Sequence, residues 1–156
     1  MAGIILRGFA PGMAARQFVL DASVALEWFI PEPRFAHPYA AAVLTAIGRD
    51  EITPAVPDFW HYEVASALLT ARRSGRIGAG KLKSATATLA AFQLATMVLQ
   101  LTAPEVIDAG LRYYLQGYDA VYFELARRLN APMATLDGGI RTACPVHKVE
   151  LLKFGE

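Results

Sequence analysis

Short apolar runs alternate with longer stretches of helical periodicity along this chain. Three runs, Phe18–Asp21, Met97–Leu101 and Met133–Leu136, have the length of buried strands, and Ile52–Val56 and Val149–Leu152 are two weaker ones. Strands that alternate with helices predict a mostly parallel sheet with helices on both faces. We therefore expect an α/β fold, an α/β/α sandwich around a central, mostly parallel sheet.

Helical periodicity fills the gaps between the apolar runs. Pro57 is well placed in a first helical turn, and Gly75 is a natural stop for the helix that follows it. The expected helices cover Pro38–Ile47, Pro57–Arg73, Lys81–Leu94, Pro104–Leu115 and Asp119–Leu129.

The composition is that of one globular domain. Its 156 residues are 54% hydrophobic and 19% charged, and we find no internal repeat or interdomain linker. We expect residues 1–16 to be a flexible N-terminal arm, disordered before about Ala15, and residues 17–156 to be the folded domain. No apolar run approaches the roughly 18 residues of a membrane span, so no membrane partner is expected.

Charge and cysteine content narrow the classes of function. The formal net charge of +1 argues against a strongly basic scaffold that coats nucleic acid. The lone Cys144 excludes an intramolecular disulfide framework and favours a reducing, cytoplasmic location.

Four carboxylates stand in apolar surroundings. Asp21 and Asp137 each end an apolar run, Glu63 lies in the amphipathic stretch after Pro57, and Asp119 opens a helical stretch. A buried, unpaired acid costs on the order of several kcal/mol or shifts its pKa. Four such acids predict a bound cation. With one Cys and three His in the chain, a hard, oxygen-liganded ion such as Mg²⁺ or Mn²⁺ is the natural candidate.

Two of these acids are expected to share one edge of the sheet. Asp21 and Asp137 each directly follow a predicted strand, and sites in open α/β sheets form beyond the carboxyl ends of the strands. Structural alternatives exist: Asp119 as a plain helix N-cap, and Asp137 as a turn residue before two glycines.

Glu63 points towards the core in the predicted helix and therefore needs a partner. A salt bridge to a nearby arginine is one solution, whereas a metal site also explains the other three acids. The helix face on which Glu63 lies is formed by Phe59, Tyr62, Ser66, Ala67 and Thr70.

Three segments of the chain, taken together, indicate a protein family. LDASVALEWFIPE, VPDFWHYEVASALLTARRSGRI and YDAVYFELARRLNAPMATLDGGI, with the spacing between them, resemble the PIN-domain ribonucleases and, more closely, the VapC toxins of type II toxin–antitoxin modules. The resemblance covers about residues 17–152. It implies an α/β/α layering, a divalent-metal site and endoribonuclease activity, with the catalytic, metal-binding acids at Asp21, Glu63, Asp119 and Asp137. Ser23 matches a small hydroxyl residue of the family and either hydrogen-bonds a metal-bound water or caps a helix.

The chain departs from the family pattern at three places. Ser66 stands where an asparagine is usual, Gln116 where a serine or threonine is usual, and Gly138-Gly139 where many members carry a basic or bulky pair. These changes affect hydrogen bonding around the site and the fit of the substrate, and none removes a carboxylate.

The resemblance also implies partners: an RNA substrate, a cognate VapB-like antitoxin that blocks the site, and a second copy of the chain in a homodimer. Candidate contacts to RNA phosphates are Arg72, Arg73, Arg76, Lys81 and Lys83, which are alternatively solvated cations at a helix end.

Aromatic and apolar residues are candidates for the protein contacts. Trp28 and Phe29 stack on a base or line an antitoxin groove, with core packing as the plain alternative for Phe29. Tyr118 and Tyr122 are expected in the core. The Ala-rich helices at Pro38–Ile47 and Ala79–Leu94 offer a patch for the homodimer.

Three functional hypotheses remain open. The first is a toxin-like endoribonuclease, the second a PIN nuclease of RNA processing or turnover without an antitoxin, and the third a catalytically silent metal-binding module. A haloacid-type phosphohydrolase is disfavoured because it needs Asp-x-Asp, and Ser23 occupies the second place.

Overall fold

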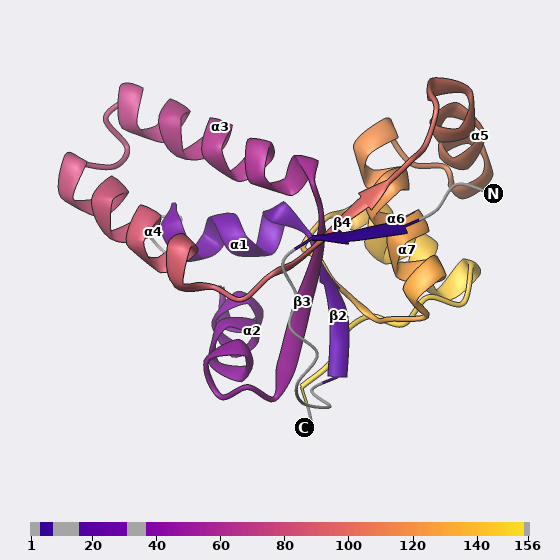
Figure 1. Cartoon of the computed structure of the whole chain (residues 1–156), viewed down its shortest axis with the longest axis horizontal. Coiled ribbons are helices and arrows are strands. Elements are labelled where there is room, and N and C mark those ends of the chain that lie inside the picture. The colour runs from indigo at the N-terminus through magenta and orange to yellow at the C-terminus, as the bar shows by residue number, and fades with distance from the viewer. Residues whose placement is uncertain (1–3, 8–15, 31–36, 155–156) are drawn as a thin grey trace.

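The sheet runs through the middle of the molecule (Figure 1). The structure is a computed structural model that describes residues 4–7, 16–30 and 37–154. Within these residues the sheet has five strands in the order β1-β4-β3-β2-β5, and β1 is antiparallel to β4 whereas the other pairs are parallel. The mostly parallel sheet predicted from the apolar runs is confirmed. The strands are β1 (Ile4–Arg7), β2 (Arg16–Leu20), β3 (Ile52–Pro57), β4 (Ala95–Leu99) and β5 (Met133–Ala134).

Helices cover both sides of the sheet, which confirms the α/β/α sandwich. In Figure 1, α1 to α4 lie on one side and α5 to α7 on the other. The five predicted helices are present with ends shifted by up to three residues, and α1 and α7 are additional. The helices are α1 (Ala22–Phe29), α2 (Pro38–Gly48), α3 (Phe59–Arg73), α4 (Ala79–Ala91), α5 (Ala103–Tyr113), α6 (Gly117–Leu129) and α7 (Gly138–Val146).

The core is centred on β2. Phe18, Val19 and Leu20 are 0% exposed because β3 and β5 flank the strand and helices cover both of its faces. A strand buried on both faces is a continuous apolar run rather than an alternating one. That is the physical reason why the sequence pattern located this strand.

Two expectations differ from the structure. Val149–Leu152 is no regular strand: Leu151 makes an isolated parallel bridge to Met133, and the Met133 backbone N–H donates to the Glu150 carbonyl at 2.8 Å. Ile4–Arg7 is strand β1, so the expectation of disorder before Ala15 is wrong for these four residues. An edge strand is held by backbone hydrogen bonds to its neighbour, which side-chain patterns do not reveal. The remainder of the expected arm lies outside the described residues.

None of the helices in the described part of the chain is long and apolar enough to cross a membrane.

Candidate active site

The four carboxylates come from elements that meet at the carboxyl end of the parallel strands. β2 and β5 are adjacent, with Leu20 paired to Ala134, so Asp21 and Asp137 share one edge of the sheet as predicted. Glu63 lies in the second turn of α3, directly after β3, and Asp119 lies in the first turn of α6. The charges of Asp21 and Asp137 act on Asp119, and the charge of Asp119 acts on Glu63, so the first turn of α6 lies at the same edge.

Asp21 is held in place by two hydroxyl groups. It is 5% exposed, and its Oδ2 accepts hydrogen bonds from Ser23 Oγ and Thr135 Oγ1, both at 2.6 Å. Ser23 Oγ also accepts from the Leu136 backbone N–H at 3.0 Å, so Ser23 positions Asp21 and is not the N-cap of α1. A carboxylate fixed in this way is oriented before any ligand binds.

Thr135 links the two acids of the sheet edge, and the sequence analysis missed it. Its hydroxyl donates to Asp21 and accepts from the Asp137 backbone N–H at 3.0 Å, and its side chain is 0% exposed. The available signal was a polar residue between Ala134 and Leu136, at the end of an apolar run that leads to an acid.

Glu63 pairs with a tyrosine rather than an arginine. Tyr122 Oη donates to Glu63 Oε2 at 2.5 Å, and Tyr122 is 1% exposed, which confirms its expected place in the core. The predicted core face of α3 is wrong, since Tyr62 on that face is 73% exposed. The large Trp60 side chain packs into the core and sets the rotation of the helix, so Glu63 lies half-buried at the edge of the inward face. That face is Trp60, Val64, Leu68 and Ala71.

The other two acids differ in their local roles. Asp119 is not an N-cap, because Gln116 occupies that position of α6. Asp137 is the N-cap of α7, and its Oδ1 accepts from the Ile140 backbone N–H at 2.8 Å. Asp137 therefore has a structural role in addition to its place at the sheet edge, whereas Asp119 has no capping role that explains it.

Asp21, Glu63 and Asp119 are electrostatically destabilised in their ionised forms. Burial raises the pKa of Asp21, opposed by the hydrogen bonds from Ser23 and Thr135. Burial also raises the pKa of Asp119 to about 6, with further contributions from the charges of Asp137 and Asp21. For Glu63, burial again comes first in raising the pKa, the Tyr122 hydrogen bond lowers it, and Asp21 and Asp119 raise it.

Asp21, Glu63 and Asp119 have no compensating side-chain cation among the described residues, whereas Arg141, one helical turn after Asp137, donates to the Thr135 carbonyl at 3.3 Å. In the part of the chain that the structure describes, no Lys, Arg or His is among the groups that shift the pKa of Asp21, Glu63 or Asp119. Like charges that share a site either keep a proton or bind a cation. A divalent ion would supply the positive charge that these three acids lack.

The donor atoms fit Mg²⁺ or Mn²⁺ in kind. All are carboxylate oxygens, which hard divalent ions prefer. Yet among residues 4–7, 16–30 and 37–154, no three His, Cys, Asp or Glu side chains are already arranged to hold a metal ion. Mg²⁺ usually retains several waters and contacts only one or two carboxylates directly, so a loose acidic edge is compatible with this ion.

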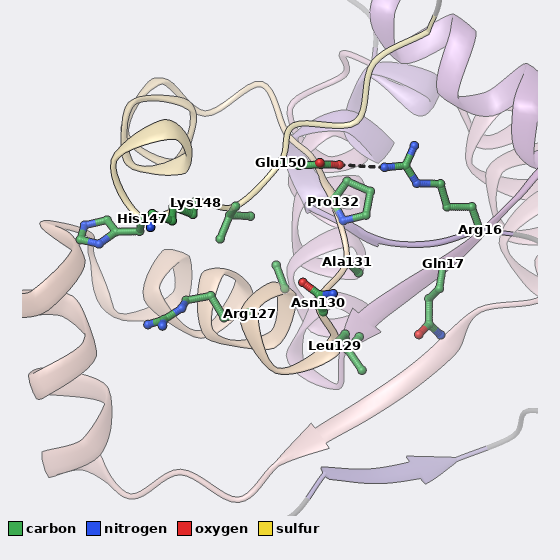
Figure 2. A pocket seen from close by; sticks show the side chains of 12 residues that line it. Arg16, Gln17, Arg127, Leu129, Asn130, Ala131, Pro132, His147, Lys148 and Glu150 are labelled. Atoms are coloured by element: carbon green, nitrogen blue, oxygen red, sulfur yellow. Dashed lines mark hydrogen bonds and ion pairs between the residues drawn. The ribbon is translucent and has the colours of Figure 1, made fainter.

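A cleft of about 630 Å³ adjoins the acids. It opens beyond the carboxyl ends of β3 and β4, and Glu63 and Asp119 are both part of its wall. A cavity of about 710 Å³ lies at the opposite end of β2, where Arg16 pairs with Glu150 at 2.8 Å (Figure 2). None of the four acids lines that larger cavity. We therefore take the smaller cleft beside the acids, and not the larger cavity, as part of the candidate site.

The structure does not bring the predicted RNA contacts to the acids. Arg72 and Arg73 are in the last turn of α3, nine and ten residues after Glu63, or about 14 to 15 Å along the helix axis. Arg76 and Lys81 follow, in the turn after α3 and in the first turn of α4. This turn joins the ends of α3 and α4 that lie away from the sheet (Figure 1).

The two residues predicted to line an antitoxin groove, Trp28 and Phe29, are both occupied by packing within the chain. Phe29 is 4% exposed and belongs to the core, so it is wrong as a surface contact. Trp28 is half-buried: its ring packs against Phe92, and its Nε1 donates to the Ala40 carbonyl at 2.7 Å. These contacts tie α1 to α2 and α4, which gives Trp28 a structural role.

The large exposed apolar side chains are on other helices than those expected at the homodimer interface. Among the described residues, large exposed apolar side chains occur on α3, α5, α6 and α7 and in the connection between α5 and α6. None of them is on α2 or α4. The homodimer patch on α2 and α4 stays a prediction, because the alanines exposed on these helices are small side chains. The expectation that Tyr118 is in the core is wrong. The large exposed side chains are Tyr62, Leu69, Ile107, Leu111, Tyr114, Tyr118 and Val146.

Comparisons with known proteins bear on the fold. No family model and no curated protein matches the chain. Among solved structures, the crystal structure of PAE2754 from Pyrobaculum aerophilum is similar, with a TM-score of 0.56 and 22% identity. The match covers 85% of this chain and 87% of that chain. This likeness supports the α/β architecture over almost the whole length.

Proposed function

We propose that this chain is a metal-dependent endoribonuclease of the PIN type that hydrolyses RNA phosphodiester bonds with Mg²⁺ or Mn²⁺. The observation that carries the proposal is the meeting of Asp21, Glu63, Asp119 and Asp137 at one edge of a parallel sheet, where no described Lys, Arg or His side chain shifts the pKa of Asp21, Glu63 or Asp119. The resemblance of the segments around these acids to the PIN-domain ribonucleases supplies the substrate class.

The residues of the site have separate tasks in this proposal. Asp21, Glu63 and Asp119 hold the ion directly or through water, and Asp137 completes the site or orients a water. Ser23 and Thr135 fix the direction of the Asp21 carboxylate through their hydrogen bonds. Tyr122 fixes Glu63 in the same way. When bound, the metal supplies an activated water and stabilises charge on the phosphoryl oxygens.

The decisive experiment is cleavage of a labelled single-stranded RNA by the purified chain with Mg²⁺ or Mn²⁺. Asp21→Asn keeps size and one oxygen but removes the charge that binds a hard cation. We expect this variant and EDTA-treated parent protein to lose cleavage, with activity restored to the parent by added metal. The matched control is Asp108→Asn, which removes an exposed charge from α5. Parent-like cleavage by Asp21→Asn would show that the metal-site assignment is wrong.

We further propose that the nuclease acts in the cytoplasm as the toxin component of a VapBC-type module, with a VapB-like antitoxin and a second copy of the chain as partners. This role rests on the resemblance of the sequence segments to VapC toxins. Induced expression with and without the product of the adjacent gene tests it. Toxicity that the neighbour relieves supports the toxin, whereas growth unaffected in both cases favours a nuclease of RNA processing.

A further inference from the structure

The cleft beside the acids has aromatic walls. The rings of Phe59 and Tyr118 lie 4.9 Å apart between centroids, and those of Phe59 and Tyr122 lie 5.2 Å apart in an edge-to-face arrangement. Tyr118 is 64% exposed, although it lies next to Asp119. The other apolar side chains of the lining are Pro57, Leu99, Leu101, Val106 and Val121. An exposed aromatic face directly beside carboxylates suits a flat ring that stacks on it.

The polar lining of the cleft is acidic and repels anions. Apart from Glu63 and Asp119, the polar side chains are Asp58 and Gln116, and none of the described lining residues is Lys, Arg or His. A phosphate would therefore be repelled from the metal-free cleft, and its place is at the wall formed by Glu63 and Asp119, where the metal would bind. An uncharged ring that carries N–H donors complements the cleft itself.

Asp58 is held in a defined position at the N-terminus of α3. It is the N-cap of the helix, and its Oδ1 accepts from the Phe59 backbone N–H at 2.9 Å. That hydrogen bond uses only Oδ1. An ionised carboxylate is only an acceptor. It favours bases with an amino group, as in the pairing of acidic side chains with the cytosine N4 amino group, over uracil, whose single N–H lies between two carbonyl oxygens that a carboxylate repels.

We propose that this cleft binds one unpaired nucleobase of the substrate RNA, next to the scissile phosphate, and prefers the amino-bearing bases guanine, adenine and cytosine over uracil. Tyr118 and Phe59 provide the stacking surface, and Asp58 with Gln116 reads the edge of the base. The inference rests on the proposed function for the RNA and for the position of the phosphate. Base binding itself can be measured without metal and without cleavage.

Neutral nucleosides isolate the cleft from the metal site, because they carry no phosphate. We expect saturation-transfer NMR on the metal-free full chain to show binding of guanosine, adenosine and cytidine, and weaker binding of uridine. Tyr118→Ala should weaken this binding about fivefold to 150-fold, the usual effect of removing a stacking ring. Tyr118→Phe should retain it. Tyr62→Ala is the matched control, because Tyr62 is 73% exposed and does not line the cleft.

Asp58→Asn tests the selectivity. Asparagine is as good an N-cap as aspartate, so α3 keeps its cap while the side chain gains an N–H donor and loses its charge. The variant should bind uridine as well as it binds cytidine. In cleavage assays with oligonucleotides that differ at one base, the parent should prefer an unpaired amino-bearing base near the cut, and Asp58→Asn should lose that preference.

The outcomes separate this inference from the proposed nuclease. Nucleoside binding that depends on Tyr118, with no RNA cleavage under any metal, supports the cleft and refutes the nuclease. RNA cleavage that is indifferent to base identity and to Tyr118→Ala overturns the cleft assignment and leaves the nuclease standing. Absence of nucleoside binding by the parent also overturns it, as does a base preference that Asp58→Asn leaves unchanged.

Discussion

Replacing Asp119 by Asn should stabilise the metal-free protein at neutral pH. The pKa of this carboxyl is about 6 in the folded chain against a usual 3.8. The folded state therefore holds the proton more tightly, and ionisation at neutral pH would cost about 3 kcal/mol at full strength. Asp119 is partly exposed, so solvent screening reduces this to roughly 1 kcal/mol. Asparagine has no charge and avoids that cost.

The sign of the pH dependence follows from proton binding. Between about pH 4 and pH 6 the native state binds more protons at Asp119 than the unfolded state does, so stability falls as pH rises through this window. Thermal unfolding in EDTA at pH 8 should give a melting temperature for Asp119→Asn that is about 2–4 °C above the parent. At pH 4 the two proteins should melt together, because the parent carboxyl is then largely protonated.

Added Mg²⁺ should close the gap at pH 8, because the cation relieves the repulsion in the parent and binds more weakly to the variant. Asp108→Asn is the control, since it removes an exposed charge from α5 outside the acidic edge. A difference in melting temperature between the parent and Asp119→Asn that is the same at every pH would refute the reasoning. A variant less stable than the parent at pH 8 would also refute it.

Three further predictions test the neighbours of the acids. Glu63→Gln should reduce the rise in melting temperature that Mg²⁺ produces, because one charged ligand is lost; an unchanged metal response would remove Glu63 from the site. Thr135→Val should lower the free energy of unfolding in urea by about 1–3 kcal/mol, because the buried Asp21 carboxylate and the Asp137 N–H lose a partner. Tyr122→Phe should raise the pKa of Glu63 further, since the Tyr122 hydrogen bond lowers it; NMR titration of the Glu63 carboxyl checks this, and an unchanged midpoint would contradict it.

The outline of the site could be predicted from the sequence because local patterns carry it. Asp21 and Asp137 each follow an apolar run, and a strand buried on both faces must be such a run. Once these strands are parallel neighbours, both acids lie at one edge of the sheet. The expectation that Tyr122 lies in the core is confirmed.

The rotation of α3 about its axis, and so its buried face, could not be predicted from the sequence. Apolar and aromatic residues occur around most of α3, so the periodicity did not decide between the face of Tyr62 and that of Trp60. Packing in three dimensions decided it, because the largest side chain fills the interior. The same limit explains Tyr118 and Phe29, whose exposure depends on neighbours from distant segments.

The sequence alone therefore determined the α/β class, the four acids and the buried strands β2 and β5 that precede two of them, because a strand buried on both faces must be an apolar run. Only the tertiary structure decided which groups surround the acids: the Thr135 hydroxyl between Asp21 and Asp137, the Tyr122 partner of Glu63, and the aromatic cleft at Tyr118. Each of these contacts joins residues from different elements. Their geometry follows from how helices rotate and pack against the sheet, which no local pattern encodes.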